Sequence, residues 1–208
     1  MTEIPPQDGS QLSLDAVDGP CELGDDAADT LLFVHGGSGS LELDGRTYEL
    51  PAGSAALVLA GERAALSGEG LEAVRLRVAP GELHAPMGER DVVVQVDEAA
   101  RDDATGGRTF QILFGPHNGL LYATVFLGYV PPGAAKWHYH LYDEIVRIDD
   151  GRARLHLEEG TRDLGPGDAF RLTPRQLHIV ENLSGESSLV TLGIFTPAGS
   201  PSAAYLPR

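Results

Sequence analysis

Residues 138–144 read HYHLYDE and residues 165–182 read GPGDAFRLTPRQLHIVEN, and these two stretches decide the predicted fold and chemistry. His138 and His140 are two residues apart, so on a strand both side chains point to one face, and Glu144 keeps the same parity. A later strand supplies a third imidazole. Imidazole and carboxylate together suit a divalent transition metal such as iron, manganese, nickel, cobalt or zinc. The expected metal ligands are His138, His140, Glu144 and His178.

Short alternating runs of apolar residues surround these stretches. Apolar residues occupy every second position in these runs, as at Leu41 and Leu43 or at Leu155 and Leu157. The chain contains 26 glycines and 14 prolines, many of which lie between the runs. Alternation with period two is typical of strands that bury one face, and no long stretch keeps a helical period. The sequence therefore predicts an all-β protein.

An internal repeat relates the two halves of the chain. Gly37 corresponds to Gly151 and Gly53 corresponds to Gly167, since 151 − 37 and 167 − 53 both give 114. The same offset aligns the apolar residues between these glycines without a gap. Equal turns and equal inward positions indicate two copies of one β-unit. We therefore expect two β-barrels in tandem.

A polar, turn-rich segment between about residues 80 and 109 is expected to join the barrels. We place the first barrel at residues 11–95 and the second at residues 105–208. The β-branched run from Val92 to Val96 interrupts the joining segment. This run is a candidate for a strand that is exchanged or shared between the halves.

The repeat also tests the metal site, because a duplicated site would reappear at the same offset in the first half. His138, His140, Glu144 and His178 correspond instead to Gly24, Asp26, Thr30 and Ala64. The first half thus keeps the turns and core positions but lacks the ligand set. We expect the second barrel alone to hold a metal.

The second half of the chain resembles the cupin superfamily. The first cupin motif is matched by Gly133, then His138, His140 and Glu144 in the order His-x-His-x-x-x-Glu, then Gly151. The second is matched by Pro166, Gly167 and Asp168, then Pro174, His178 and Asn182. The resemblance implies a double-stranded β-helix, or jelly-roll, barrel with three histidines and one glutamate binding a divalent metal in its mouth. The whole chain looks like a bicupin with a degenerate N-terminal cupin.

This resemblance implies a metal-dependent enzyme that acts on a small organic molecule. Cupins with this ligand set include dioxygenases, isomerases, lyases and cyclases, and the two-histidine, one-carboxylate combination favours dioxygenase chemistry. The alternative is a non-catalytic bicupin that binds a metal or a small ligand, in which protein ligands close the coordination of a structural ion. A storage or stress protein is a third reading, which the single intact site and the short chain disfavour. A homodimer is a further expectation at the level of the family.

Two residues near the ligands are candidates for supporting roles. Lys136 shares the parity of His138, so as a catalytic residue its ammonium would anchor a carboxylate or phenolate in the mouth; alternatively it points to solvent. Asn182 either accepts a hydrogen bond from a metal-binding imidazole or satisfies backbone groups at the end of its strand.

Strand parity also predicts which neighbours face the metal. The inward positions, expected to line an apolar cavity, are Val146, Ile148, Phe170, Leu172 and Val180. Ile145 and Arg147 have the opposite parity. We expect them to face the other barrel, a partner subunit or solvent.

The charge balance disfavours two classes of partner. The 208 residues include 31 acidic and 15 basic side chains, a net charge of −16, which repels nucleic acids and anionic membranes. Cys21 is the single cysteine, so no intrachain disulfide forms. The start of the chain lacks a signal-peptide pattern, and no apolar run reaches the roughly 20 residues that span a bilayer. A cytoplasmic protein with a small-molecule substrate is the resulting expectation.

Overall fold

The computed structural model describes residues 2–5, 10–133 and 136–206 and confirms the all-β expectation. The first half contains β1 (Leu12–Asp18), β2 (Cys21–Leu23), β3 (Asp29–Gly36), β4 (Ser38–Leu43), β5 (Arg46–Pro51), β6 (Ser54–Val58), β7 (Ala64–Ser67), β8 (Glu72–Val78) and β9 (Val93–Gln95). The second contains β10 (Asp102–Asp103), the short 3-10 helix η1 (Thr105–Gly107), β11 (Thr109–Phe114), β12 (Thr124–Val130), β13 (Asp143–Asp150), β14 (Ala153–Leu157), β15 (Gly160–Leu164), β16 (Ala169–Leu172), β17 (His178–Asn182) and β18 (Leu189–Thr196).

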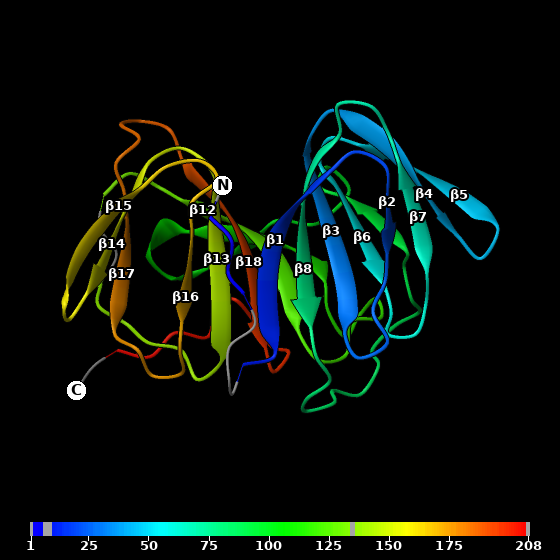
Figure 1. Cartoon of the computed structure of the whole chain (residues 1–208). Helices are drawn as coiled ribbons and strands as arrows, with labels where there is room; N and C mark the ends of the chain where they lie inside the picture. The colour runs from blue at the N-terminus through cyan, green and yellow to red at the C-terminus, as the bar shows by residue number, and fades with distance from the viewer. Residues whose placement is uncertain (1, 6–9, 134–135, 207–208) are drawn as a thin grey trace.

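These strands form two jelly-roll barrels in tandem. The first barrel combines a five-stranded sheet, in the order β1-β8-β3-β6-β9, with a four-stranded sheet, in the order β2-β7-β4-β5. The second combines a six-stranded sheet, in the order β10-β11-β12-β18-β13-β16, with a three-stranded sheet, in the order β15-β14-β17. Figure 1 shows the barrels side by side, with β1, β8, β13 and β18 in the middle of the molecule.

The apolar residues divide into cores inside the barrels and a core between them. The five inward positions expected from strand parity in the second barrel all belong to its internal cluster. Ile145, of opposite parity, joins a central cluster that contains Leu31 from the first barrel and Phe114 from the second. One face of each large sheet therefore lines its own barrel, and the other face packs against the neighbouring barrel.

The internal repeat reappears in the strand bounds. β3 and β13 begin at Asp29 and Asp143, which are 114 positions apart, and the two strands end 114 positions apart as well. The pairing of β3 with β8 and the pairing of β13 with β18 both shift register just before the last residue of β3 and β13. The glycine after each strand has a positive φ, +69° at Gly37 and +94° at Gly151. A side chain at Gly37 would lie 2.1 Å from the carbonyl oxygen of Gly70, so this turn needs glycine for space as well as for conformation.

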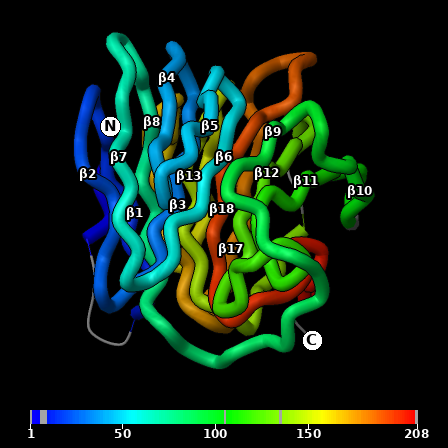
Figure 2. The backbone as a smooth tube through the Cα atoms, turned by 90° about the vertical axis from the view of Figure 1, so that its right-hand side faces the viewer, coloured from blue at the N-terminus to red at the C-terminus, as the bar shows by residue number. Residues whose placement is uncertain are grey.

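The β-branched run in the joining segment belongs to the first barrel. Its β9 pairs antiparallel with β6 and forms an edge of the five-stranded sheet, as Figure 2 also shows. Val93 packs against the core of the first barrel, whereas Val94 and Val96 pack against the central cluster. Of the two alternatives, an exchanged strand is wrong, because the ladder hydrogen bonds of β9 stay within the first sheet. The segment is shared only in its packing, through Val94 and Val96.

A largely buried ion pair adds a polar connection between the barrels. Arg171 of β16 donates two hydrogen bonds to Asp143 of β13, from Nε and Nη2, at 2.9 Å each. The same Nη2 lies 3.4 Å from the carbonyl oxygen of Leu12 in β1, and the hydroxyl of Ser10 donates to Asp143 at 2.6 Å. The segment that enters the first barrel is thus hydrogen-bonded to the strand that carries Glu144.

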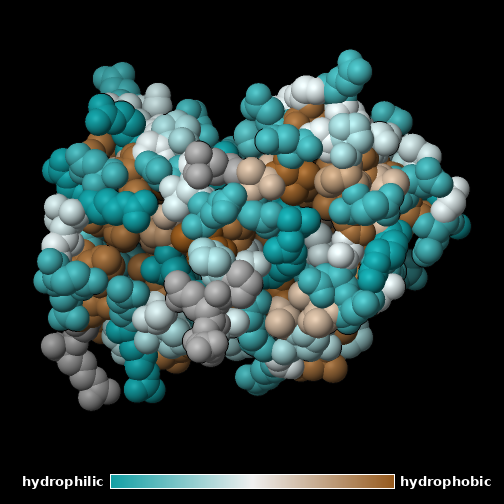
Figure 3. Space-filling view, viewed as in Figure 1, coloured by the Kyte–Doolittle hydropathy of each residue, from teal (hydrophilic) through white to brown (hydrophobic). Residues whose placement is uncertain are grey.

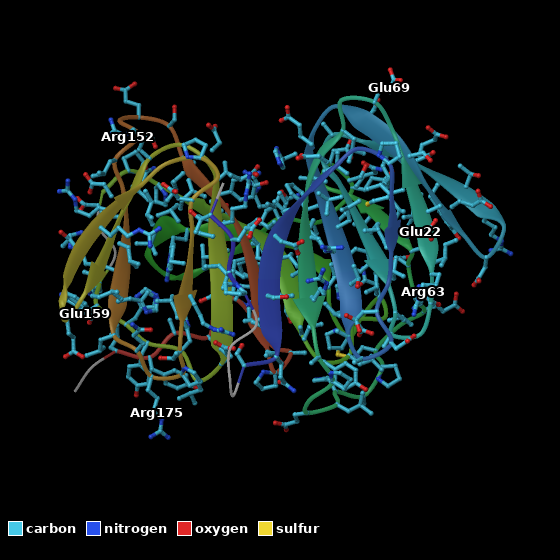
Figure 4. All side chains as sticks on the ribbon, in the orientation of Figure 1. Glu22, Arg63, Glu69, Arg152, Glu159 and Arg175 are labelled. Carbon is cyan, nitrogen blue, oxygen red and sulfur yellow. The ribbon has the colours of Figure 1, made fainter. Side chains whose placement is uncertain are left out.

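The outer surface carries the charge expected from the composition. Figure 3 shows hydrophilic residues spread over both barrels, with a notch between the barrels at the top of that view. The charged residues labelled in Figure 4 point away from the barrels, among them Glu22 on the first barrel and Glu159 on the second. Among the described residues, no helix is long and apolar enough to cross a membrane.

Candidate metal centre

Three histidines meet at one end of the second barrel because two segments pair there. His138 lies in the connection between β12 and β13, and His178 begins β17. Their backbones form an isolated antiparallel bridge, with distances of 3.2 Å and 3.0 Å between the amide nitrogens and the carbonyl oxygens. His140 follows two residues after His138, on the same side. The bridge therefore brings the first ligand stretch against the second.

The imidazoles are close enough to share one ion. One nitrogen from each of His138, His140 and His178 lies within 4.8 Å of the others, and all three residues are buried. The ring centroids of His138 and His178 are 4.3 Å apart, and each lies 5.0 Å from the centroid of His140. Within the part of the chain that the structure describes, this is the one group of at least three ligand-type side chains so close together.

Backbone carbonyls fix the orientation of all three rings. The Nδ1 atoms of His138, His140 and His178 lie 2.9 Å from the carbonyl oxygens of Lys136, Ala203 and Gln176, respectively. A carbonyl oxygen can only accept, so each neutral ring carries its proton on Nδ1. Each Nε2 then keeps a free lone pair, the form that binds a metal.

Burial keeps these rings neutral. It lowers the pKa of His140 to about 4 and the pKa of His178 to about 3, and it also lowers the pKa of His138. The hydrogen bonds to backbone carbonyls act in the opposite direction but are the weaker influence. Neutral imidazoles at physiological pH are ready to act as ligands without first losing a proton.

Glu144 lies beside the histidines on β13. One of its carboxylate oxygens, Oε2, is 3.8 Å from Nε2 of His140, and its side chain is buried. Burial raises the pKa of Glu144 to about 8, while the positive charge of Arg108 opposes this shift. Glu144 lies outside the group of ligand atoms within 4.8 Å that the three histidines form. Three imidazoles with a buried carboxylate next to one of them are nevertheless a donor set that fits a divalent transition metal, whose positive charge would offset the cost of burying the anion.

The four residues line a pocket that opens at the end of the barrel. Its volume is about 610 Å³, including the open mouth. The apolar wall includes Val146, Leu172 and Val180, three of the residues that parity placed inward. The ring of Tyr142 stacks between His140 and Phe195, with centroid distances of 4.6 Å and 4.0 Å. The pocket therefore combines a polar cluster with an apolar lining, as small-molecule sites generally do.

Arg108 is a pocket residue that the sequence did not indicate. It lies just before β11, is half-buried, and alone among the described pocket-lining residues has a permanent positive charge. Burial lowers its pKa, and the neighbouring Tyr142 and Glu144 raise it. Arg108 directly follows a polar stretch that we interpreted as part of the joining segment. This stretch has no strand periodicity from which the direction of the Arg108 side chain could be predicted.

The structure places the side chains of Lys136 and Asn182, the two candidates for supporting roles, away from direct contact with the imidazole rings. Lys136 is exposed and is not among the described residues that line the pocket, although its backbone carbonyl orients His138. Its proposed catalytic role remains a prediction. Asn182 donates 2.8 Å hydrogen bonds to the carbonyls of Val130 and Ser187. It therefore satisfies backbone groups at the end of β17, which was the second of its two expected roles.

The equivalent positions in the first barrel are occupied differently. Thr30, at the position of Glu144, is buried, and its hydroxyl oxygen has no hydrogen-bond partner among the described residues. Ala64, at the position of His178, packs in the apolar core of the first barrel. Asp26, at the position of His140, is exposed and pairs with Arg63 at 2.6 Å. These three positions thus provide core packing and a surface ion pair.

Comparison with known proteins supports the cupin superfamily. Residues 126–195, which include the three histidines and Glu144, match the family model described as Cupin domain. Oxalate decarboxylase from Bacillus subtilis, in a structure concerned with its Mn(II) centres, aligns with a TM-score of 0.73 and 16% identity over 95% of this chain and 71% of that chain. AerE from Microcystis aeruginosa aligns with a TM-score of 0.69 and 16% identity, over 89% and 86%. No curated protein sequence matches. At these identities the structural likeness establishes the fold.

Proposed function

We propose that the protein is a metal-dependent cupin enzyme acting on a small organic anion. The observation that carries this proposal is the cluster of three buried imidazoles, with the buried carboxylate of Glu144 3.8 Å from Nε2 of His140, in a pocket that also contains Arg108. His138, His140, His178 and Glu144 would hold the metal. When bound, a divalent metal in such a site polarises a substrate oxygen or activates dioxygen. Among the reaction types of such cupins, dioxygenase chemistry is our first candidate and lyase chemistry our second.

The protein's own residues would do three things for the substrate. Arg108 would bind its anionic group, because a guanidinium forms charge-assisted hydrogen bonds with carboxylates and keeps its charge at neutral pH. Val146, Leu172 and Val180 would exclude water from its apolar part. Burial raises the pKa of Tyr142, so its phenol would remain protonated and able to donate a hydrogen bond.

The first test is the metal content and turnover of the His138→Ala variant. We expect the unmodified protein to purify with, or take up, one transition metal ion and to turn over a member of a panel of carboxylates, phenols and thiols, with oxygen uptake if it is a dioxygenase. His138→Ala should lose both metal and turnover. His156→Ala is a matched control, because His156 pairs with Glu181 at 2.7 Å and does not line the pocket in the described structure.

The outcome separates the enzyme from a binding protein. Loss of metal with no turnover of any panel member by the unmodified protein would favour the non-catalytic alternative. An unmodified protein that neither contains nor takes up a metal would contradict the proposal altogether.

Replacing Arg108 tests the anionic substrate. We expect Arg108→Gln to raise the KM for an anionic substrate about 10- to 100-fold, because hydrogen bonds to charged groups contribute about 1.5–3 kcal/mol. The metal affinity should change much less, since Arg108 is not a ligand in this proposal. Arg108→Lys, which keeps the charge, should recover part of the loss. Equal KM values for Arg108→Gln and the unmodified protein would show that the substrate is bound by other groups.

A further inference from the structure

The segment 199–206 crosses the mouth of the second barrel after β18. It is the red trace along the lower end of that barrel in Figure 1. No sequence pattern indicated a role for this segment, because it contains none of the expected ligands and no strand pattern. Its contacts with the metal centre are nevertheless direct.

Both ends of this segment are anchored to the barrel. The hydroxyl of Thr124, a buried residue of β12, donates to the carbonyl of Gly199 at 3.0 Å and accepts from its N–H at 3.1 Å. At the other end, Tyr205 and Tyr139 exchange two backbone hydrogen bonds of 3.0 Å, and their rings stack at 5.6 Å. The segment therefore spans the mouth between two fixed points.

Between its anchors the segment contacts the metal centre twice. Pro201 lines the pocket, and the carbonyl of Ala203 accepts the hydrogen bond from Nδ1 of His140 at 2.9 Å. The corresponding carbonyls for His138 and His178 lie two residues earlier in the same stretch of chain, at Lys136 and Gln176. The partner of His140 is instead 63 residues away in sequence. The orientation of this one ring thus depends on a distant segment.

We propose that the segment 199–206 is a positioning element of the metal centre, which holds His140 with Nε2 towards the other ligands and forms one wall of the pocket. This inference rests on the proposed role of His140 as a metal ligand. The ring of Tyr142 supports one face of the imidazole but places no acceptor in the ring plane, so the carbonyl of Ala203 selects the tautomer. Loss of such an outer partner typically weakens metal binding 10- to 100-fold.

The test weakens both anchors by removing the side-chain part of each, and it measures binding of Co²⁺ to the full-length protein. In Thr124→Val with Tyr205→Ala, the valine keeps the volume of the threonine but removes its hydroxyl, and the alanine removes the stacked ring. We expect at least a tenfold increase in the dissociation constant for Co²⁺ and a faster loss of Co²⁺ to a chelator. The matched variant, Thr124→Ser with Tyr205→Phe, keeps the hydroxyl and the ring. It should bind Co²⁺ within about twofold of the unmodified protein.

Two further measurements make each outcome decisive. If Thr124→Val with Tyr205→Ala lowers the melting temperature of the metal-free protein but binds Co²⁺ as tightly as the matched variant, the segment serves the fold alone and the inference is wrong. If that variant does not fold, Tyr205→Ala alone replaces it, because the Tyr205 side chain is 45% exposed and its loss removes little packing. We then expect the nitrogen NMR signals of His140 to show a mixture of tautomers, and a single Nδ1–H tautomer would contradict the inference.

The same series keeps this inference separate from the proposed function. If the unmodified protein does not bind Co²⁺, the metal site itself is wrong. If the unmodified protein binds Co²⁺ and His140→Ala does not, but weakening the anchors has no effect, only the role of the segment is wrong.

Discussion

Glu144→Gln is expected to weaken the binding of Co²⁺ or Zn²⁺ more than about 100-fold, beyond the usual effect of losing an outer partner. The amide keeps the size of the side chain but loses the negative charge that a divalent ion needs. The metal-free variant should be as stable as the unmodified protein or more stable, because a buried carboxylate is costly without a cation and an amide is less so. Metal titration and thermal unfolding in a chelator measure these two quantities.

Glu181→Gln is the matched control for this substitution. Glu181 also lies beside an imidazole, at 2.7 Å from Nε2 of His156, but is not among the described residues of the pocket. We expect its replacement to leave metal binding unchanged. If Glu144→Gln bound metal as tightly as the unmodified protein, the ligand set would be reduced to the three histidines, and the two-histidine, one-carboxylate argument for dioxygenase chemistry would lose its basis.

Arg171→Ala is expected to lower the free energy of unfolding by about 3–5 kcal/mol, the usual cost of breaking a buried ion pair by removing one partner. The side chains of Arg171 and Asp143 are 9% and 15% exposed, so the remaining carboxylate would be poorly hydrated. The substitution also removes the contact with the carbonyl of Leu12, and thus one polar connection between the barrels. Denaturant unfolding followed by circular dichroism measures the loss.

Arg154→Ala provides the comparison for Arg171. Arg154 and Asp163 form a similar two-bond pair, with distances of 2.6 Å and 3.0 Å, but their side chains are 40% and 52% exposed. Solvent screens such pairs, so this variant should be nearly as stable as the unmodified protein. Equal losses for the two variants would mean that burial of the Arg171–Asp143 pair adds nothing to the stability of the tandem arrangement.

The sequence predicted those features that follow from parity and repetition. The spacing of His138 and His140 placed both rings on one side, and the offset between Gly37 and Gly151 predicted two barrels. Parity also predicted that Ile145 faces the other barrel, a partner subunit or solvent, and the first of these holds, because it packs in the central cluster. The last two predictions succeeded because a duplicated unit keeps its turns and a strand has a fixed alternation. The two histidines instead lie in the connection before β13, where an isolated bridge pairs His138 with His178.

Other features of the site had no signal in the sequence. Arg108 directly follows an irregular stretch, so no period indicated that it enters the pocket. The contact of Ala203 with His140 comes from a backbone carbonyl, which every residue type carries. Asn182 occupies the motif position at which we considered a hydrogen-bond partner for a metal-binding imidazole. Its side-chain amide instead donates hydrogen bonds to the backbone carbonyls of Val130 and Ser187. Tertiary contacts decided these cases.

The use of main-chain carbonyls to orient the three imidazoles has a consequence for how the protein can change over time. A point substitution at Lys136, Gln176 or Ala203 replaces a side chain but leaves the acceptor oxygen in the chain. The ring orientations are thus buffered against most mutations at the positions that set them. Side chains around the mouth can therefore vary, and with them the choice of substrate, while the ligand geometry is inherited unchanged.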